Sequence, residues 1–302
     1  MNKHETLSQT DKPINPKETT SKIDYLTPPQ RVVVTTLEQK LQEEFGEEGS
    51  GHDWLHLNRV RNTAVSLARG TEGANVFVVE VAALLHDYKD PKIEGSEARH
   101  SVRQVLVPLD MDEETIGSIS DITENIGFSK ADKKEWTNIE GKIVEDADRI
   151  DAIGATGIAR TFAFGGNRGE SHAETVKHFH EKLFKLRNLM NTQAGKIIAN
   201  RRHEFMVEFL GRFSEEMLEM ESFREQLLND VNNLNTLGAT GIATAFADAG
   251  KRKVPMYNGK DTITNSMKLK LQTPKEIAIA KDRRLYMTWY LAQLAAEQQG
   301  QK

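Results

Sequence analysis

The sequence predicts an all-α protein, and three observations support this fold class. Apolar residues recur at helical spacing along most of the chain after residue 28, whereas the apolar–polar alternation of strands is almost absent. One run, VFVVEVAALLHD (76–87), is apolar on nearly all sides. Such a run is typical of a helix buried in the middle of a domain, although its β-branched start would also suit a strand.

The N-terminal part combines a polar tail with the first helices. Residues 1–28 lack periodicity and are rich in Thr, Ser, Lys, Asn and Pro, so we expect a disordered tail. A first helix should run from Pro29 to its stop at Gly46, with an inner face of Val32, Val33, Leu37, Leu41 and Phe45. A second should cover 56–68, with an inner face of Leu57, Val60, Ala64 and Leu67.

Helices account for most of the remaining chain. Pro91 should end the helix of residues 76–87. Further helical patterns cover 96–107, 112–125, 132–150, 173–190, 192–224 and 275–298.

An internal repeat divides the chain. IGATGIARTFAFGG (153–166) and LGATGIATAFADAG (237–250) share GATGIA, and 9 of 16 positions match across 151–166 and 235–250, an offset of 84 residues. Gly and Ala repeated in helices predict close helix packing. We therefore expect a main domain over 29–230 and an extension over 231–302 that carries a degenerate copy.

Composition excludes several classes of protein. The chain of 302 residues has no cysteine, which removes disulfide scaffolds, thiol catalysis and Cys-based zinc sites and fits a cytoplasmic protein. It has no run of 18 apolar residues and no apolar segment typical of a secretory signal at its start. A net charge of −5 argues against a nucleic-acid partner, so an anionic partner should be small. The sequence does not determine the oligomeric state.

Two His-Asp pairs are candidates for a metal site. His52-Asp53 follows a polar Gly-rich loop, and Asp53 has the position of an N-cap for a helix that begins at Trp54. His86-Asp87 instead closes an apolar run, and a carboxylate buried there needs a cation or hydrogen-bond donors. A divalent metal would meet that need; a His–Asp hydrogen bond or a helix end facing solvent is the alternative.

Several motifs occur together in a characteristic order. H-x-x-R-V (His56, Arg59, Val60) precedes HD (His86, Asp87), and A-D-R (Ala147, Asp148, Arg149) follows. This order resembles the HD-domain metal-dependent phosphohydrolase superfamily. Within it, HDW-x-H-x-x-R-V, LLHD, DADRIDAIGATGIARTFAFGG and HFHEKLFKL are similar to a subgroup of stand-alone HD hydrolases, over roughly residues 30–225.

The resemblance implies an all-α HD-domain bundle that holds one divalent metal. The implied ligands are His56, His86, Asp87 and Asp148, although Asp146 or Asp151 could replace Asp148 if the helix register differs. A set of two imidazoles and two carboxylates suits Mn first, with Fe, Co, Ni or Zn as other candidates, rather than Mg or Ca.

Further roles follow from the same resemblance. Asp90 is expected to be the general acid/base, the alternative being a cap of the turn before Pro91. Phosphate contacts are expected from Lys89, Arg160, Lys182 and His178. His52, Arg59 and Arg149 are expected to contact the ligand side chains and fix their orientation without touching the metal.

The implied activity is hydrolysis of a phosphoester or phosphoanhydride bond in a small nucleotide, a nucleoside or deoxynucleoside phosphate, by a metal-activated water. The alternatives are a non-catalytic HD-fold module that binds a nucleotide or a protein, and a purely structural helical scaffold.

The sequence departs from the subgroup after residue 166, because a loop of the type KRKVPMYNG (251–259) follows the second GATGIA copy instead of the first. The extension is therefore expected to be a packing appendage, a lid or a poorly ordered tail. At the offset of 84 residues, Asp148 falls on Asn232 and Arg149 on Asn233, so the copy lacks the ligand carboxylate.

Overall fold

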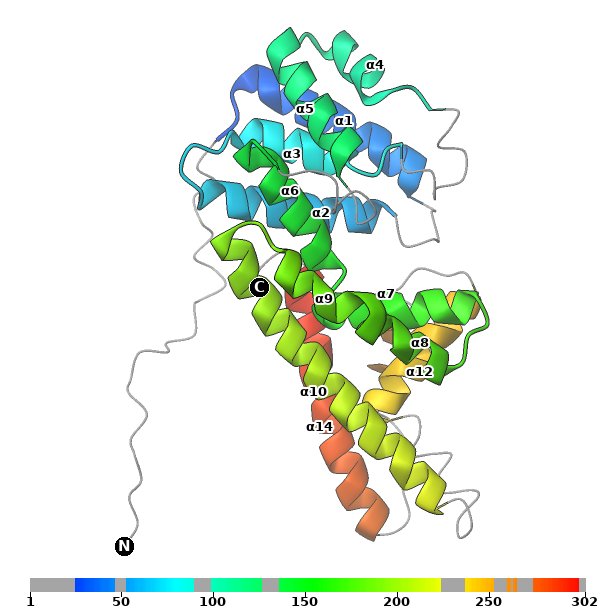
Figure 1. Ribbon diagram of the computed structural model, residues 1–302. Coiled ribbons are helices and arrows are strands. Elements are labelled where there is room, and N and C mark those ends of the chain that lie inside the picture. The colour runs from blue at the N-terminus through cyan, green and yellow to red at the C-terminus, as the bar shows by residue number, and fades with distance from the viewer. Residues whose placement is uncertain are drawn as a thin grey trace, which may run out of the picture.

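The computed structural model describes residues 25–46, 53–89, 99–126, 136–223, 237–252, 260–261, 263–264 and 274–298. Every regular element in these ranges is helical, which confirms the predicted fold class. The described helices before residue 126 form an upper lobe, and the described helices after residue 153 form a lower lobe (Figure 1). None of the described helices is both long and apolar enough to cross a membrane.

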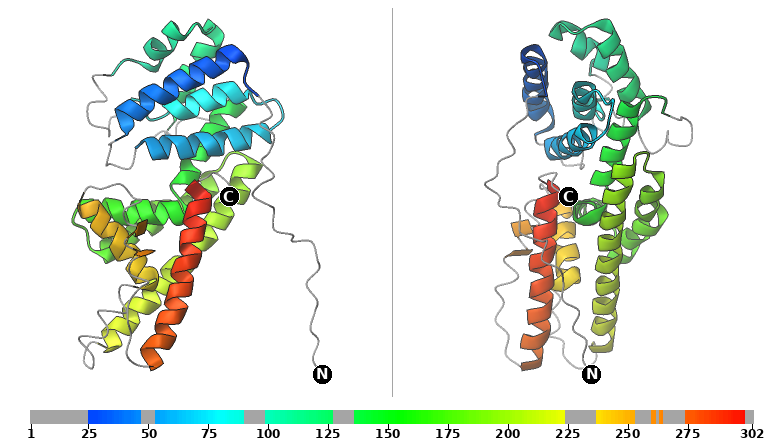
Figure 2. Two further views of the ribbon diagram at one scale, coloured as in Figure 1. Left: turned by 180° about the vertical axis from the view of Figure 1, so that it is seen from behind. Right: turned by 90° about the vertical axis from the view of Figure 1, so that its left-hand side faces the viewer.

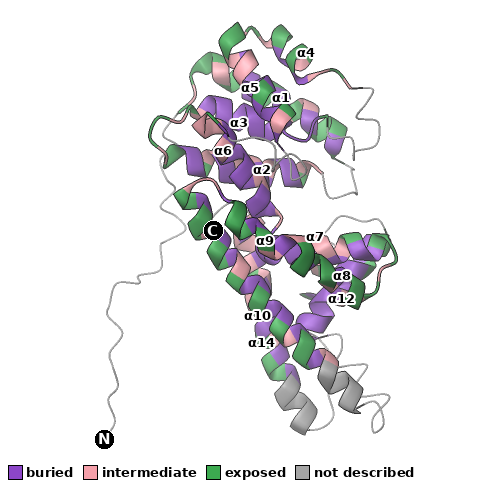
Figure 3. Cartoon of the chain, viewed as in Figure 1, coloured by how far each residue is buried: buried purple, intermediate pink, exposed green. Residues whose placement is uncertain are grey.

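The centre of the upper lobe is α3 (Val76–Leu85). Every residue from Phe77 to Leu85 is buried (Figure 3). Three helices pack around it: α2 (Trp54–Arg69), α5 (Glu113–Asn125) and α6 (Ile139–Asp151). The prediction of a central helix is confirmed, although the helix ends at Leu85 and leaves His86 and Asp87 in the turn that follows.

The first helix, α1 (Pro28–Phe45), covers α3 with a stripe of Val33, Val34, Leu37, Leu41 and Phe45. Val32, which was expected on this face, is 67% exposed. The helical period explains the difference, since the positions one turn before Leu37 are 33 and 34, and residue 32 lies off that stripe.

The segment before α1 is anchored to a buried charge. Glu80 on α3 is fully buried, and it accepts hydrogen bonds from Arg61 Nε at 2.8 Å and Tyr25 OH at 3.1 Å. Thr27 caps α1 in a capping box with Gln30. Residues 25–28 thus belong to the fold, contrary to the prediction that a disordered tail reaches residue 28, and residues 1–24 lie outside the described residues.

Two predicted helices are divided into shorter elements. Within the predicted span 96–107, the described part contains α4 (Val102–Leu106), followed by the 3-10 turn η2 (Val107–Leu109). Within 173–190 the chain forms α8 (His172–His178), the π-helical segment η4 (Phe179–Leu183), α9 (Phe184–Leu186) and the 3-10 turn η5 (Arg187–Leu189). Apolar spacing predicts helical conformation here, but not changes between helix types.

Two short and two long helices form the centre of the lower lobe. α7 (Gly154–Asn167) and α12 (Gly238–Lys251) carry the repeat, and α10 (Gln193–Phe223) and α14 (Pro274–Gln298) lie beside them (Figure 2). The four helices share one core, which includes the fully buried rings of Phe162, Phe209, Phe246 and Tyr290. The predicted extension therefore packs into the same core as residues of the predicted main domain.

Close packing of the repeat helices is confirmed. Gly166 on α7 lies against the backbone of Ala247, and Gly250 on α12 lies against the backbone of Ala163. A Cβ atom at either glycine would overlap the opposing carbonyl oxygen, so these contacts require glycine.

The difference between Leu37 and Val32 can be tested by unfolding in denaturant. Leu37 is 1% exposed, so Leu37→Ala should lower the free energy of unfolding by about 2–5 kcal/mol through lost burial and a cavity. Val32→Ala on the same helix should change it by less than about 0.5 kcal/mol. Equal losses from the two variants would contradict the observed orientation of α1.

Candidate metal centre

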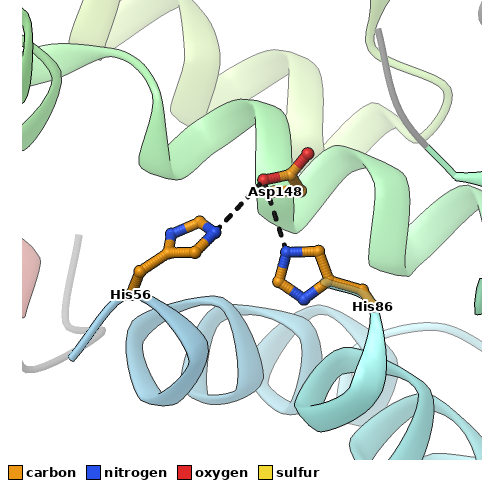
Figure 4. Close-up of side chains that lie close together, drawn as sticks. All are labelled: His56, His86 and Asp148. Atoms are coloured by element: carbon orange, nitrogen blue, oxygen red, sulfur yellow. Dashed lines mark ion pairs between the residues drawn. The ribbon is translucent and has the colours of Figure 1, made fainter. Parts of the chain in front are cut away.

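Four side chains from three separate segments meet where the upper lobe joins α6. His56 comes from α2, His86 and Asp87 from the turn after α3, and Asp148 from α6. His56, His86 and Asp148 each offer one ligand atom, and these atoms lie within 4.8 Å of one another (Figure 4).

Both carboxylates face both imidazoles. Asp87 Oδ2 lies 3.2 Å from His56 Nε2 and 3.3 Å from His86 Nε2. Asp148 Oδ1 lies 3.7 Å from His56 Nε2 and 3.6 Å from His86 Nε2. The structure therefore brings together all four of the ligands that the sequence motifs implied.

The cluster is buried on all but one side. His56 is 1%, His86 5% and Asp87 8% exposed, whereas the side chain of Asp148 is 31% exposed. A small ligand would reach the cluster along the exposed edge of Asp148.

Burial and charge act in opposite directions on the ligand side chains. Burial alone lowers the pKa of His86, but the carboxylates of Asp87 and Asp148 raise this pKa well above its usual value. Burial raises the pKa of Asp87, and the opposing effect of His86 and His56 brings it well below the usual value. The two carboxylates thus stabilise positive charge between them, which a proton on His86 or a bound cation can supply.

The hydrogen bonds of the two imidazoles fit a divalent metal. His86 Nδ1 lies 2.8 Å from the carbonyl oxygen of Ala83, and His56 Nδ1 lies 2.7 Å from Asp151 Oδ2. A carbonyl or carboxylate oxygen only accepts, so both Nδ1 atoms carry a proton and the Nε2 atom of each ring faces the cluster. Buried His86 Nε2 has no hydrogen-bond partner in the part of the chain that the structure describes. A metal ion between the two rings would take the place of any proton on these Nε2 atoms.

Asp151 holds His56 in place from behind. Asp151 is 3% exposed, and its carboxylate accepts hydrogen bonds from Arg59 Nε at 2.7 Å and from Arg59 Nη2 at 3.1 Å. Arg160 Nη1 donates to Asp151 Oδ2 at 2.7 Å. Burial raises the pKa of Asp151, but Arg59 and the hydrogen bond from His56 bring it well below its usual range. Asp151 is therefore an ionised group that orients the imidazole of His56. The sequence analysis missed this role, because it considered Asp151 only as a possible metal ligand.

Asp146, the other possible substitute for Asp148, points away from the cluster. It is fully buried and accepts hydrogen bonds from Asn191 N at 2.7 Å and from Thr192 N at 2.8 Å, just before α10. Residues two apart on a helix point to opposite sides, so Asp146 and Asp148 cannot share one site.

The two arginines expected behind the ligands have different roles. Arg59 donates to Asp151, which lies 2.7 Å from His56 Nδ1, and its expected support of a metal ligand stays a prediction. Arg149 instead pairs with Glu145 at 2.9 Å and donates to the carbonyl of Leu189. Its described contacts fix the segment before α10 and not a ligand carboxylate, which corrects the expectation for Arg149.

The expected phosphate contacts are scattered. Arg160 lies beside the cluster, with Nη1 at 3.1 Å from His56 Nδ1, and is already engaged by Asp151. Lys89 is exposed and donates to the carbonyl of Arg99 at 2.7 Å. Lys182 lies in the π-helical segment, and His178 is exposed at the end of α8. Their contacts with a substrate remain predictions.

The structure describes one residue of the first His-Asp pair, Asp53, and both residues of the second. Asp53 caps α2 by accepting from His56 N at 2.8 Å, as its position before Trp54 predicted. His52 and Asp90 lie outside the described residues, so the roles expected for them remain predictions.

Asp151→Asn should weaken metal binding by about 10–100-fold, the usual effect of removing the group that orients a ligating histidine. The neutral amide no longer balances Arg59 and Arg160 and no longer fixes the His56 tautomer. Metal titration followed by calorimetry measures the change, and Asp121→Asn, at an exposed position on α5, serves as the control. Unchanged metal affinity in Asp151→Asn would contradict this role.

No known family profile matches the chain. A curated relative does: the uncharacterized protein YpgQ of Bacillus subtilis is 38% identical in an alignment of 186 residues, which covers 59% of this chain and 90% of YpgQ.

Solved structures give the same result. The structure of Bacillus subtilis YpgQ in complex with ADP is 37% identical, with a TM-score of 0.51 over 59% of this chain and 93% of YpgQ. An HD-superfamily hydrolase of Bacillus thuringiensis is also 37% identical, with a TM-score of 0.52 over 62% of this chain and 98% of that protein. With His56, the His86-Asp87 pair and Asp148 gathered in one buried cluster, this similarity shows that the chain belongs to the HD superfamily of hydrolases.

Proposed function

We propose that this protein is a divalent-metal-dependent phosphohydrolase that cleaves a phosphoester or phosphoanhydride bond in a small nucleotide. The observation that carries the proposal is the buried cluster in which two imidazole Nε2 atoms, fixed by hydrogen bonds at Nδ1, face the carboxylates of Asp87 and Asp148. A cluster held only by hydrogen bonds would not need the Nε2 atoms of both rings to face the same two carboxylates.

One relative supports a nucleotide as the substrate. YpgQ of Bacillus subtilis, 37% identical, has a structure in complex with ADP. A nucleoside phosphate is therefore the substrate class we propose for this chain, and a nucleoside or deoxynucleoside phosphate would approach along the exposed edge of Asp148.

The proposed mechanism assigns each residue a physical task. His56, His86, Asp87 and Asp148 would hold the ion, for which Mn is our first candidate and Fe, Co, Ni and Zn are others. When bound, a divalent ion supplies Lewis acidity for a phosphoryl oxygen and lowers the pKa of a water molecule. Asp151 and Arg59 keep His56 in the ligating tautomer. Asp90, three residues after Asp87, would exchange a proton with the water or the leaving group.

Loss of a ligand tests the metal assignment. His86→Ala and Asp87→Ala should each lose the bound metal and the phosphohydrolase activity, because three remaining ligands leave a cation poorly neutralised. Metal content by mass spectrometry, and phosphate and pyrophosphate release from a nucleotide panel with added Mn, measure the two effects. His100→Ala, at an exposed position, should retain both. One metal per chain in both ligand variants would refute the site, and a bound metal without any turnover in the unmodified protein would favour a non-catalytic binding module.

The role of Asp90 is tested separately. Asp90→Asn should retain the metal and slow turnover by about 10²–10⁴-fold, the range for loss of a general acid/base. Should the metal be lost as well, Asp90 would be a ligand and its assignment as proton carrier would be wrong.

A further inference from the structure

The two GATGIA helices begin in the same way. α7 begins at Gly154 with φ of 79°, and α12 begins at Gly238 with φ of 71°. These glycines are related by the repeat offset, since 238 − 154 = 84. A positive φ at both positions favours glycine and gives the two helices the same entry geometry.

A buried glutamate caps each of these helices. Glu297 on α14 accepts from Ala155 N at 2.9 Å and Thr156 N at 2.8 Å at the start of α7. Glu216 on α10 accepts from Ala239 N at 3.0 Å and Thr240 N at 2.8 Å at the start of α12. Two backbone N–H groups and the positive end of the helix dipole stabilise each carboxylate, which is why Glu216 and Glu297 can be 8% and 5% exposed. A side chain at Gly154 or Gly238 would collide with the glutamate that caps it.

The long helices carry equivalent residues as well. Arg202, Phe209 and Glu216 on α10 correspond to Arg283, Tyr290 and Glu297 on α14 at a constant offset of 81 residues, since 283 − 202 = 290 − 209 = 297 − 216 = 81. All six residues are buried. Phe162 of α7 packs on Phe209 at 6.0 Å between ring centroids, and the equivalent pair, Phe246 of α12 and Tyr290, lies at 6.5 Å. α7 with α10 and α12 with α14 are thus two versions of one arm.

The two arms contact each other reciprocally. Gly166 of α7 meets Ala247 of α12, and Gly250 meets Ala163; the offset of 84 converts the first contact into the second. The equivalent rings of Phe209 and Tyr290 touch across the centre at 5.9 Å. Each long helix also sends its glutamate to the short helix of the other arm. Reciprocal contacts of this kind define the two-fold interface of a homodimer.

We propose that α12 and α14 are an internal second copy of the arm that α7 and α10 form, and that they occupy the face on which a second whole chain would otherwise bind. α12 and α14 lie against α7 and α10 in both views of Figure 2. The partner that fits this face is thus another copy of the arm. If α12 and α14 are displaced, Glu216 no longer caps α12 and Glu297 no longer caps α7. Glu216 can then cap α7 of a second chain by accepting hydrogen bonds from Ala155 N and Thr156 N.

The proposal is tested by displacing α12 without changing α7. Gly250→Leu adds a side chain that overlaps the backbone of Ala163, so α12 should leave the face. α14 packs on α12 and should leave with it, which removes Glu297 from the start of α7. The face itself keeps Gly166 and Ala163, and a second chain should then bind. Sedimentation equilibrium over a wide range of protein concentrations should show a dimer for Gly250→Leu and half that mass for the unmodified chain.

Gly166→Leu is the matched control. It also displaces α12, because its side chain overlaps the backbone of Ala247, but it blocks the α7 face for any partner. It should therefore keep the mass of the unmodified chain. Gly250→Ala and Gly166→Ala repeat the comparison with smaller side chains if a leucine variant loses its helical circular dichroism.

A third variant tests the exchanged cap. Glu216→Gln added to Gly250→Leu should raise the dimer dissociation constant by about 10-fold, since a neutral amide replaces a charge-assisted bond at a helix N-terminus. Equal masses for Gly250→Leu and the unmodified chain would overturn the proposal. So would equal association of the Gly250→Leu and Gly166→Leu variants, which would indicate non-specific contact through exposed apolar surface.

Discussion

The buried carboxylate of Asp151 connects α2, α6 and α7 beside the candidate metal centre. Asp151 lies at the end of α6, Arg59 and His56 lie on α2, and Arg160 lies on α7. A carboxylate that is removed from water is costly unless charged donors surround it, and here two guanidinium groups and one imidazole do so. The same contacts fix which nitrogen of His56 faces the cluster. Stability of the helix junction and chemistry of the ligand therefore depend on one group.

The C-terminal end of the chain reaches this junction through α7. Glu297 caps α7 at Ala155 and Thr156, and Tyr290 OH donates to the carbonyl of Ala155 at 2.8 Å. Arg202 Nη1 donates to the carbonyl of Ile150 at 2.7 Å, next to Asp151. The last helix thus stabilises the connection between α6 and α7, the segment that sets the position of Asp151. No ligand comes from the described part of the extension, yet it supports the element that orients one.

A two-fold interface within one chain has different energetics from a dimer. The two arms are linked covalently, so their association is intramolecular and does not depend on protein concentration. Contacts too weak to hold two separate chains can then persist, and the two arms can diverge. Divergence is visible at the centre, where Phe209 on one arm faces Tyr290 on the other and only Tyr290 has a hydroxyl to donate to Ala155.

The sequence by itself determined the all-α class and a central helix within residues 76–87, and it singled out His56, His86, Asp87 and Asp148, which the fold brings together. These features depend on local spacing and on motif order, which are properties of the linear chain. Only the tertiary structure decided that Asp151 orients His56, that Asp146 and Arg149 anchor the segment before α10, and that Glu216 and Glu297 cap each other's arms. The partners that set these roles lie far along the chain: 95 residues from Asp151 to His56, 45 from Asp146 to Asn191, 40 from Arg149 to Leu189, 23 from Glu216 to Ala239 and 142 from Glu297 to Ala155. Residue type alone does not select among distant partners. A carboxylate on a helix can bind a metal, cap another helix or pair with an arginine. Which of these roles it has depends on the groups that the fold places next to it.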